Sequence, residues 1–217
     1  MEQFSFLLPT EIEYTDYGKE KVLEKCRSLG VSCLLLVTDK GIEELPFFLE
    51  FLGFLEQSGL RCRIYSRVEA NPKDYNVAEC AEIIKDEKSE AVIAFGGGSP
   101  IDCAKAAIAS AAHPEWEVRE LENLSADADN AGHSRQPSYL PLIAVPTTAG
   151  TGSEVTFSSV ITDTQEHFKF TIKSPRIAPK FAVLDPSLTI SMPPLLTAAT
   201  GMDALTHAIE AYTAKNA

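Results

Sequence analysis

The chain has 217 residues, of which 45% are hydrophobic and 23% are charged, a composition typical of a globular protein with a sizeable core. Its net charge of −12 argues against nucleic acid and against an anionic membrane as partners, because both bind clustered lysine and arginine. No secretion signal or membrane span is expected, since the N-terminus has no basic region and no apolar run reaches about 18 residues. The scattered cysteines lack a CxxC spacing and favour buried free thiols in a reducing cytoplasm.

Two kinds of segment alternate along the first part of the chain. Helical spacing of apolar residues predicts helices at 17–30, 41–59, 71–90 and 99–112. Short runs rich in Val, Ile and Leu predict buried strands at 32–39, 61–68, 91–97, 142–148 and 181–186. This alternation is typical of the doubly wound α/β class, in which a mostly parallel sheet is covered on both faces. Such sheets bind ligands at the carboxyl ends of their strands.

The pattern changes after residue 112. Residues 113–140 are polar and predict a long surface loop with at most one short helix, in which His113 and His133 are solvated. Residues 158–163 and 167–174 predict a hairpin-like pair of strands. From Pro193 the sequence is helical and rich in alanine. We therefore assign 1–190 to the α/β domain and 191–217 to the beginning of an all-helical domain, with a boundary near 186–193.

The strongest local signal is the segment AVIAFGGGSPIDCAKA at 91–106. An apolar strand leads into Gly97 and Gly98, and a helix then opens with Ser99 as its expected N-cap. Glycines let the backbone approach a ligand closely, and the free N–H groups at a helix start attract a pyrophosphate. The alternative is a tight turn without a ligand, closed by a capping box that includes Asp102. We favour phosphate binding for the glycines and leave both roles open for Asp102.

A second segment, PTTAGTGSEVT at 146–156, follows another predicted strand. Its side chains Thr147, Thr148, Thr151 and Ser153 offer hydroxyl groups at a strand end. Taken alone, the segment is more typical of a Gly/Thr turn without a ligand. Its position at the same strand-end surface as the triple glycine favours a binding role.

Asp39 stands at the carboxyl end of the first predicted strand. A carboxylate at this position can hold the ribose hydroxyls of an adenosine and repel a 2′-phosphate, which favours NAD over NADP. The alternative, a turn or helix-capping aspartate before Gly41, is equally compatible with the sequence.

Asp203 and His207 lie four residues apart in the helical segment GMDALTHAIEAY. They therefore share one face of the helix. Isolated pairs of this kind are usually structural, and two ligands do not complete a metal site that activates an alcohol.

Together these segments resemble the iron-containing (group III) alcohol dehydrogenase family. The motifs GGGSPIDCAKA, PLIAVPTTAGTGSEVT, AVLDPSL and TGMDALTHAIEAY follow the order and spacing of that family over essentially the whole chain. The resemblance implies an NAD(P)-binding α/β domain, followed by a helical domain in which one Asp and three His bind a metal. Asp203 and His207 match the first two ligands. The other two would lie downstream, so we expect either a fragment of a longer protein or a short paralogue without the metal.

The resemblance also implies roles for residues of the cofactor site. Asp39 matches a residue at the adenosine ribose, Asn71 a cofactor contact, Lys169 a lysine at the cofactor ribose and Leu188 a residue that packs near it. Without the resemblance, Lys169 would be interpreted as an exposed strand lysine. The two loops match through Gly97, Gly98, Ser99, Asp102, Thr147, Thr148, Thr151 and Ser153.

The implied function is metal-dependent hydride transfer between a primary alcohol or aldehyde and NAD, with Fe²⁺ stabilising the alkoxide. Zn²⁺ or Mn²⁺ would also suit Asp and His ligands. A homo-oligomer, dimeric or higher, is expected, and the 217-residue chain alone is expected to be inactive. Two alternatives remain open: a zinc-dependent, glycerol-type polyol dehydrogenase of the same superfamily, and a non-catalytic nucleotide-binding module.

Overall fold

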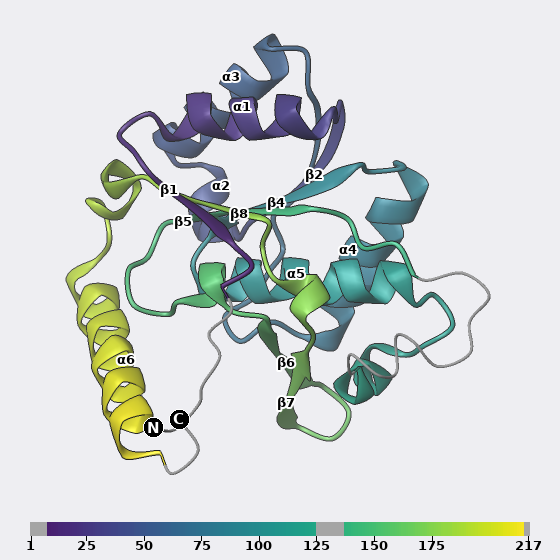
Figure 1. Cartoon of the computed structure of the whole chain (residues 1–217), viewed down its shortest axis with the longest axis vertical. Helices are drawn as coiled ribbons and strands as arrows, with labels where there is room; N and C mark the ends of the chain where they lie inside the picture. Colours follow the sequence, from purple (N-terminus) through teal and green to yellow (C-terminus); the bar gives the residue numbers. More distant parts are fainter. Residues whose placement is uncertain (1–7, 125–136, 215–217) are drawn as a thin grey trace, which may run out of the picture.

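The computed structural model describes residues 8–124 and 137–214 (Figure 1). It confirms the doubly wound α/β architecture, with a six-stranded sheet between layers of helices. The strands are β1 (Glu11–Tyr14), β2 (Cys33–Val37), β3 (Arg61–Tyr65), β4 (Ala91–Gly96), β5 (Leu142–Pro146), β6 (Ser158–Asp163), β7 (Phe168–Lys173) and β8 (Phe181–Leu184). The α-helices are α1 (Gly18–Leu29), α2 (Lys40–Glu43), α3 (Pro46–Gln57), α4 (Asp74–Asp86), α5 (Gly98–Ala112) and α6 (Pro194–Thr213).

The large sheet has the strand order β1-β8-β5-β4-β2-β3, and every neighbouring pair is parallel. The chain passes from β2 to β3 on one side and then returns to β4 on the other side of β2. Such a reversal opens a crevice at the carboxyl ends of the two strands, where open α/β sheets bind ligands. The topology therefore places the ends of β2 and β4 at the predicted site.

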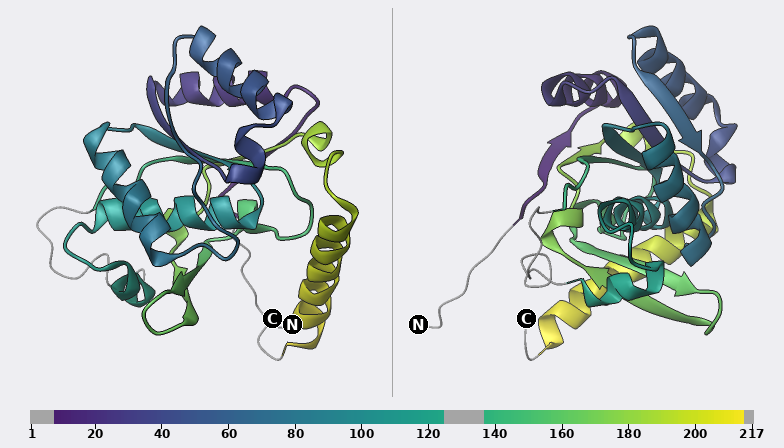
Figure 2. Two further views of the ribbon diagram at one scale, coloured as in Figure 1. Left: turned by 180° about the vertical axis from the view of Figure 1, so that it is seen from behind. Right: turned by 90° about the vertical axis from the view of Figure 1, so that its right-hand side faces the viewer.

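Both faces of the sheet are buried, which explains why the strands are almost continuously apolar. Leu34 and Leu36 of β2 pack in one hydrophobic cluster with residues of α1 and α3. Leu35 and Val37 belong to a second cluster with residues of α4 and α5. Figures 1 and 2 show the two pairs of helices on opposite sides of the sheet.

Three features differ from the expected elements. β1 was not predicted, because this edge strand is short and carries two glutamates, Glu11 and Glu13, rather than an apolar run. The expected helix at 41–59 is two helices, since Pro46 has no N–H for a preceding turn and begins α3. The expected N-cap at Ser99 is wrong: α5 starts at Gly98 with Gly97 as its N-cap.

The segment after α5 is only partly a surface loop. It contains the short 3₁₀ helix η1 (Val118–Asn123), as the sequence allowed. The prediction that His113 is solvated is wrong: the ring is buried, stacks on Trp116 and lies with Nε2 2.8 Å from the Tyr139 hydroxyl. His133 lies outside the described residues. The predicted hairpin is confirmed as the antiparallel pair β6 and β7.

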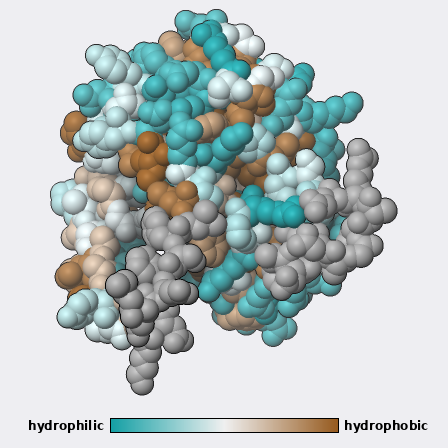
Figure 3. Space-filling view, viewed as in Figure 1, coloured by the Kyte–Doolittle hydropathy of each residue, from teal (hydrophilic) through white to brown (hydrophobic). Residues whose placement is uncertain are grey.

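Helix α6 lies beside the α/β body (Figure 1). Its apolar side chains Leu205, Ile209 and Tyr212 are exposed, and Figure 3 shows hydrophobic surface over this helix. Its backbone touches the loop after β5, because a Cβ atom placed on Gly150 would lie only 2.1 Å from the carbonyl oxygen of Thr200. In the described part of the chain, no helix is long and apolar enough to cross a membrane.

Candidate cofactor site and metal-ligand pair

A cavity of about 1670 Å³ lies at the carboxyl edge of the sheet and reaches α6. The structure brings every predicted site residue into its lining: Asp39, Asn71, Gly97, Gly98, Ser99, Asp102, Thr147, Thr148, Thr151, Ser153, Lys169, Leu188, Asp203 and His207. These residues come from the segments that follow β2, β3, β4, β5 and β8, from the first turns of α5, from β7 and from α6.

The glycine loop and the threonine loop form a close-packed cradle. A Cβ atom on Gly97 would lie 3.2 Å from Thr148 Cγ2, and one on Gly98 would lie 3.3 Å from Thr151 Cβ. Thr148 Oγ1 is buried without a hydrogen-bond partner among the described residues. The cradle opens at the N-terminus of α5, a 15-residue helix whose first N–H groups have no partner within the helix. The free N–H groups and the Thr148 hydroxyl could donate hydrogen bonds to a phosphate group, and the glycines would let it approach the backbone closely.

Asp39 caps a helix and also lines the cavity. Its Oδ1 accepts a hydrogen bond of 3.1 Å from the N–H of Ile42, in the first turn of α2. The capping alternative considered for this residue is therefore observed. Burial raises the pKa of the Asp39 carboxyl, against the backbone hydrogen bonds from Gly41 and Ile42.

Lys169 and Asn71 form a polar contact that links β7 to the loop before α4. Lys169 Nζ donates to Asn71 Oδ1 at 2.7 Å. Lys169 is nevertheless an exposed residue of β7, as the alternative without the resemblance expects. Asn71 has a left-handed backbone conformation, with φ of 55°. Its N–H donates to Ser99 Oγ at 3.3 Å, and its carbonyl accepts from Thr162 Oγ1 at 3.2 Å. These contacts tie the end of β3, the start of α5 and the hairpin together.

Asp102 does not form the capping box that was its alternative role. Its Oδ1 accepts from the Ser153 hydroxyl, and its Oδ2 accepts from the N–H of Val160 at 3.0 Å. Burial raises the pKa of Asp102, and the nearby Lys105 ammonium opposes this change. The carboxylate thus joins α5 to the second loop while it lines the cavity.

Lys105 was not singled out by the sequence reasoning. Its side chain is completely buried, and Nζ donates to the carbonyls of Ser153 at 2.6 Å and Ser158 at 2.9 Å. Burial lowers the pKa of Lys105 to about 8, against the attraction of Asp102 and Glu154. The available signal was a single charge within the run CAKAAIA, three residues after Asp102.

Asp203 and His207 lie on one face of α6, as their spacing predicts. Asp203 Oδ1 is 3.8 Å from His207 Nε2, and both side chains are about half exposed. Within residues 8–124 and 137–214, no group of three or more His, Cys, Asp or Glu side chains is arranged to hold a metal ion. The pair therefore offers one carboxylate and one imidazole of an incomplete ligand set.

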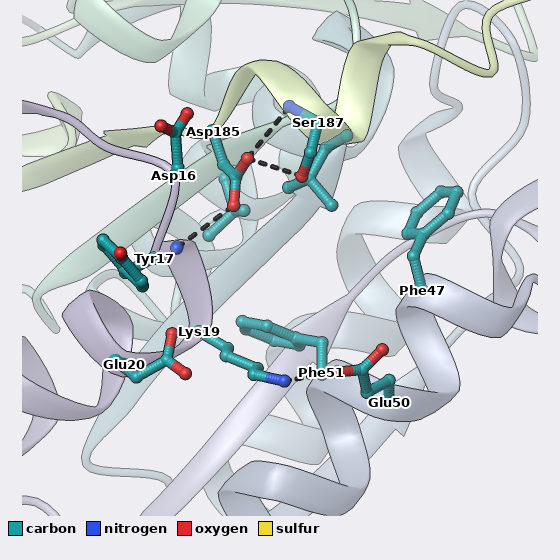
Figure 4. Close-up of a pocket in the computed structure, with 12 residues that line it drawn as sticks. Asp16, Tyr17, Lys19, Glu20, Phe47, Glu50, Phe51, Asp185 and Ser187 are labelled. Atoms are coloured by element: carbon teal, nitrogen blue, oxygen red, sulfur yellow. Dashed lines mark hydrogen bonds and ion pairs between the residues drawn. The ribbon is translucent and has the colours of Figure 1, made fainter.

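A smaller cavity of about 310 Å³ adjoins the large one at Phe47 and Leu188. Figure 4 shows it between the start of α1, the helix α3 and the segment after β8. Asp185 Oδ2 accepts from the N–H of Gly18 at 3.1 Å. The lining includes four carboxylates, Asp16, Glu20, Glu50 and Asp185, together with Lys19, which pairs with Glu50. This excess of negative charge makes it unsuitable for a phosphate.

The fold and the strand-end cavity define a Rossmann-like α/β domain. The model of the family described as iron-containing alcohol dehydrogenase matches residues 9–186. The chain belongs to this family.

Several relatives are similar over nearly the whole chain. A choline dehydrogenase of Bacillus subtilis is 42% identical over 99% of the chain and 52% of its own length. A 1,3-propanediol dehydrogenase of Klebsiella pneumoniae is 38% identical over 99% of the chain and 54% of its own length. The crystal structure of a sulfoacetaldehyde reductase from Bifidobacterium kashiwanohense in complex with NAD⁺ is 33% identical, with a TM-score of 0.83, and covers 97% of this chain and 53% of that one. The chain thus spans about half the length of these relatives.

Proposed function

We propose that the protein is a metal-dependent alcohol dehydrogenase that transfers a hydride between a primary alcohol or aldehyde and NAD. In this proposal residues 1–190 hold NAD, and residues 191–217 begin the helical metal-binding domain. The observation that carries it is the single cavity that contains both the predicted cofactor residues and the pair Asp203 and His207. Family membership and the names of the relatives support it.

The residues of the α/β domain fit a dinucleotide. The cradle of Gly97, Gly98 and Thr148 would hold the pyrophosphate at the start of α5. Asp39 would accept hydrogen bonds from the adenosine ribose, and Leu188 would pack near the ribose contacted by Lys169. Lys169, already in contact with Asn71, would reach the cofactor ribose, and Asn71 would contact the cofactor.

The pair on α6 fits two ligands of a divalent metal, for which we propose Fe²⁺. A bound metal would stabilise the charge on the substrate oxygen, while NAD would exchange the hydride. The protein side chains would hold and orient both partners. His207 serves as a ligand in this scheme rather than as a general base.

The deciding experiment combines NAD titration of the chain with a spectrophotometric assay of the full-length enzyme. NADH formation from a primary alcohol in the presence of Fe²⁺ supports the proposal. A preference for glycerol with bound zinc would favour a polyol dehydrogenase. NAD binding without any turnover in the metal-loaded full-length protein would favour a non-catalytic module.

We also propose a homo-oligomer, because β1 is an edge strand with exposed Ile12 and Tyr14. We further propose a location in the cytoplasm, because all five cysteines are free thiols. The apparent mass in solution tests the first point.

Replacing Asp39 by glycine should narrow the preference for NAD over NADP. The wild-type carboxylate would repel the 2′-phosphate of NADP, so we expect it to bind NAD at least about tenfold more tightly. Parallel fluorescence titrations with both cofactors measure the two affinities. Wild-type protein that prefers NADP would show that Asp39 has a different role.

The affinity for NAD should depend on pH through the same carboxyl. An ordinary aspartate has a pKa of about 3.9. Burial raises the pKa of Asp39, so its carboxylate becomes protonated at a higher pH than an ordinary aspartate does. NAD binding should therefore weaken as pH falls through this raised pKa. The folded chain binds this proton more readily than the unfolded chain, so this group's stabilisation of the fold is lost as pH rises through the same pKa. Asp39→Asn should bind NAD more weakly than wild type, and its NAD affinity should change less as the pH falls. The same pH dependence of NAD affinity in both proteins would contradict this prediction.

A further inference from the structure

We propose that Lys105 is a positioning residue of the cofactor site, which holds the segment 153–158 against α5 in the conformation that binds the dinucleotide. This inference rests on the proposed binding of NAD in the large cavity. It assigns a role to a buried charge that does not itself line that cavity.

The Lys105 ammonium is directed at both ends of one short segment. Nζ lies 2.6 Å from the carbonyl oxygen and 3.2 Å from the hydroxyl of Ser153. It also lies 3.1 Å from Thr156 Oγ1 and 2.9 Å from the carbonyl oxygen of Ser158. An ammonium has three N–H donors, so these acceptors use its whole hydrogen-bonding capacity. Residues 153–158 therefore wrap around the buried Lys105 ammonium.

The same helix connects this point to the cradle. Gly98 is the first residue of α5, and Lys105 follows two turns later. Asp102 lies between them: it accepts from Ser153 and Val160, and its Oδ1 is 3.9 Å from Lys105 Nζ. Because α5 is a regular helix, these contacts fix the distance between Ser153 in the second loop and the glycines of the first.

Without the ammonium, the segment would lose its common anchor. The carbonyls of Ser153 and Ser158 would lose their hydrogen bonds from a charged donor, and Ser153 would keep the longer bonds of 3.4 Å from the N–H and the hydroxyl of Thr156. The buried Asp102 carboxylate would lose its nearby cation. The segment can relieve this by moving outward toward solvent. Only molecules whose segment keeps the original conformation can then bind the ligand. The apparent Kd therefore rises as the fraction of such molecules falls.

The test compares Lys105→Met with Lys25→Met. Lys25 is also a buried lysine, and it pairs with Glu11 and Glu13, but none of these residues lines either cavity. Both variants should unfold at a lower temperature. At a temperature where both are folded by circular dichroism, the Kd for NAD should rise about tenfold or more for Lys105→Met. For Lys25→Met it should stay within about twofold of wild type.

Lys105→Gln provides a second variant in case the methionine protein does not fold. Glutamine keeps an N–H donor but loses the charge and some reach, so its Kd should lie between those of wild type and Lys105→Met. Wild-type affinity in a folded Lys105 variant, or an equal loss in Lys25→Met, would overturn the inference. Wild-type protein that does not bind NAD would instead overturn the proposed function.

Discussion

Gly98→Val is expected to abolish NAD binding by this chain, with a Kd raised by about two orders of magnitude or more. The first added carbon would lie 3.3 Å from the Thr151 side chain, and the two methyl groups beyond it would fill the cradle. The helix N-terminus would then be screened from a phosphate. Folding should be nearly unaffected, because valine at a helix start costs less than about 1 kcal/mol.

The effect should come from lost space rather than from backbone strain. Among the three glycines of this loop, the left-handed region is adopted by Gly96, with φ of 151°, and not by Gly98. Gly53→Val, in the middle of α3, is a matched control, because only Gln57 Nε2 lies within 4 Å of its added Cβ. Calorimetric titration with NAD and circular dichroism measure binding and folding. Unchanged NAD affinity in Gly98→Val would instead support the alternative in which the glycines form a tight turn that binds no ligand.

Asp203→Ala and His207→Ala should each remove most of the metal and most of the activity from the full-length protein. Each change deletes one of the two proposed ligands on α6, and a missing ligand weakens metal binding steeply. NAD affinity should be retained, because the cradle and Asp39 are not altered. His207→Gln keeps some of the side-chain volume and separates loss of the imidazole from loss of packing.

The 217-residue chain should bind NAD but hold no stoichiometric metal and show no alcohol oxidation. Its described residues supply only this pair, on a helix whose apolar side chains are exposed. Elemental analysis beside an NADH absorbance assay, on both lengths of protein, measures metal and turnover. Tightly bound metal and turnover in the shorter protein would mean that residues outside this pair complete the site.

The sequence predicted the sheet, and which segments meet at its edge, where residues close in the chain carry the signal. The apolar runs located five of the six strands of the sheet, and the glycines marked the cradle at the end of β4. The strand-end rule then placed the threonine loop and Asp39 on the same surface. Their roles toward a ligand stay predictions.

The features that were missed depend on partners far away in the chain. Lys105 looks like an isolated charge, because its acceptor Ser153 is 48 residues away. β1 carries no apolar run, and its two glutamates pair with the buried ammonium of Lys25 on α1. His113 looks solvated until Tyr139 and Trp116 are seen to enclose it. Long-range contacts of this kind decide burial, and a local pattern of residue types does not report them.

The contact between Gly150 and Thr200 sets the closest approach of α6, which carries the proposed metal ligands, to the loop after β5 in the proposed cofactor site. Gly150 has a φ of 140° and leaves no room for a side chain, so main chain rests directly on main chain. Three residues further along α6 stands Asp203, and one turn later His207. No side-chain replacement can bring this helix nearer to the threonine loop, and any at position 150 would push it away. In the proposed reaction, main-chain contact would thus limit how close the helix with the proposed metal ligands can come to the threonine loop of the proposed cofactor site.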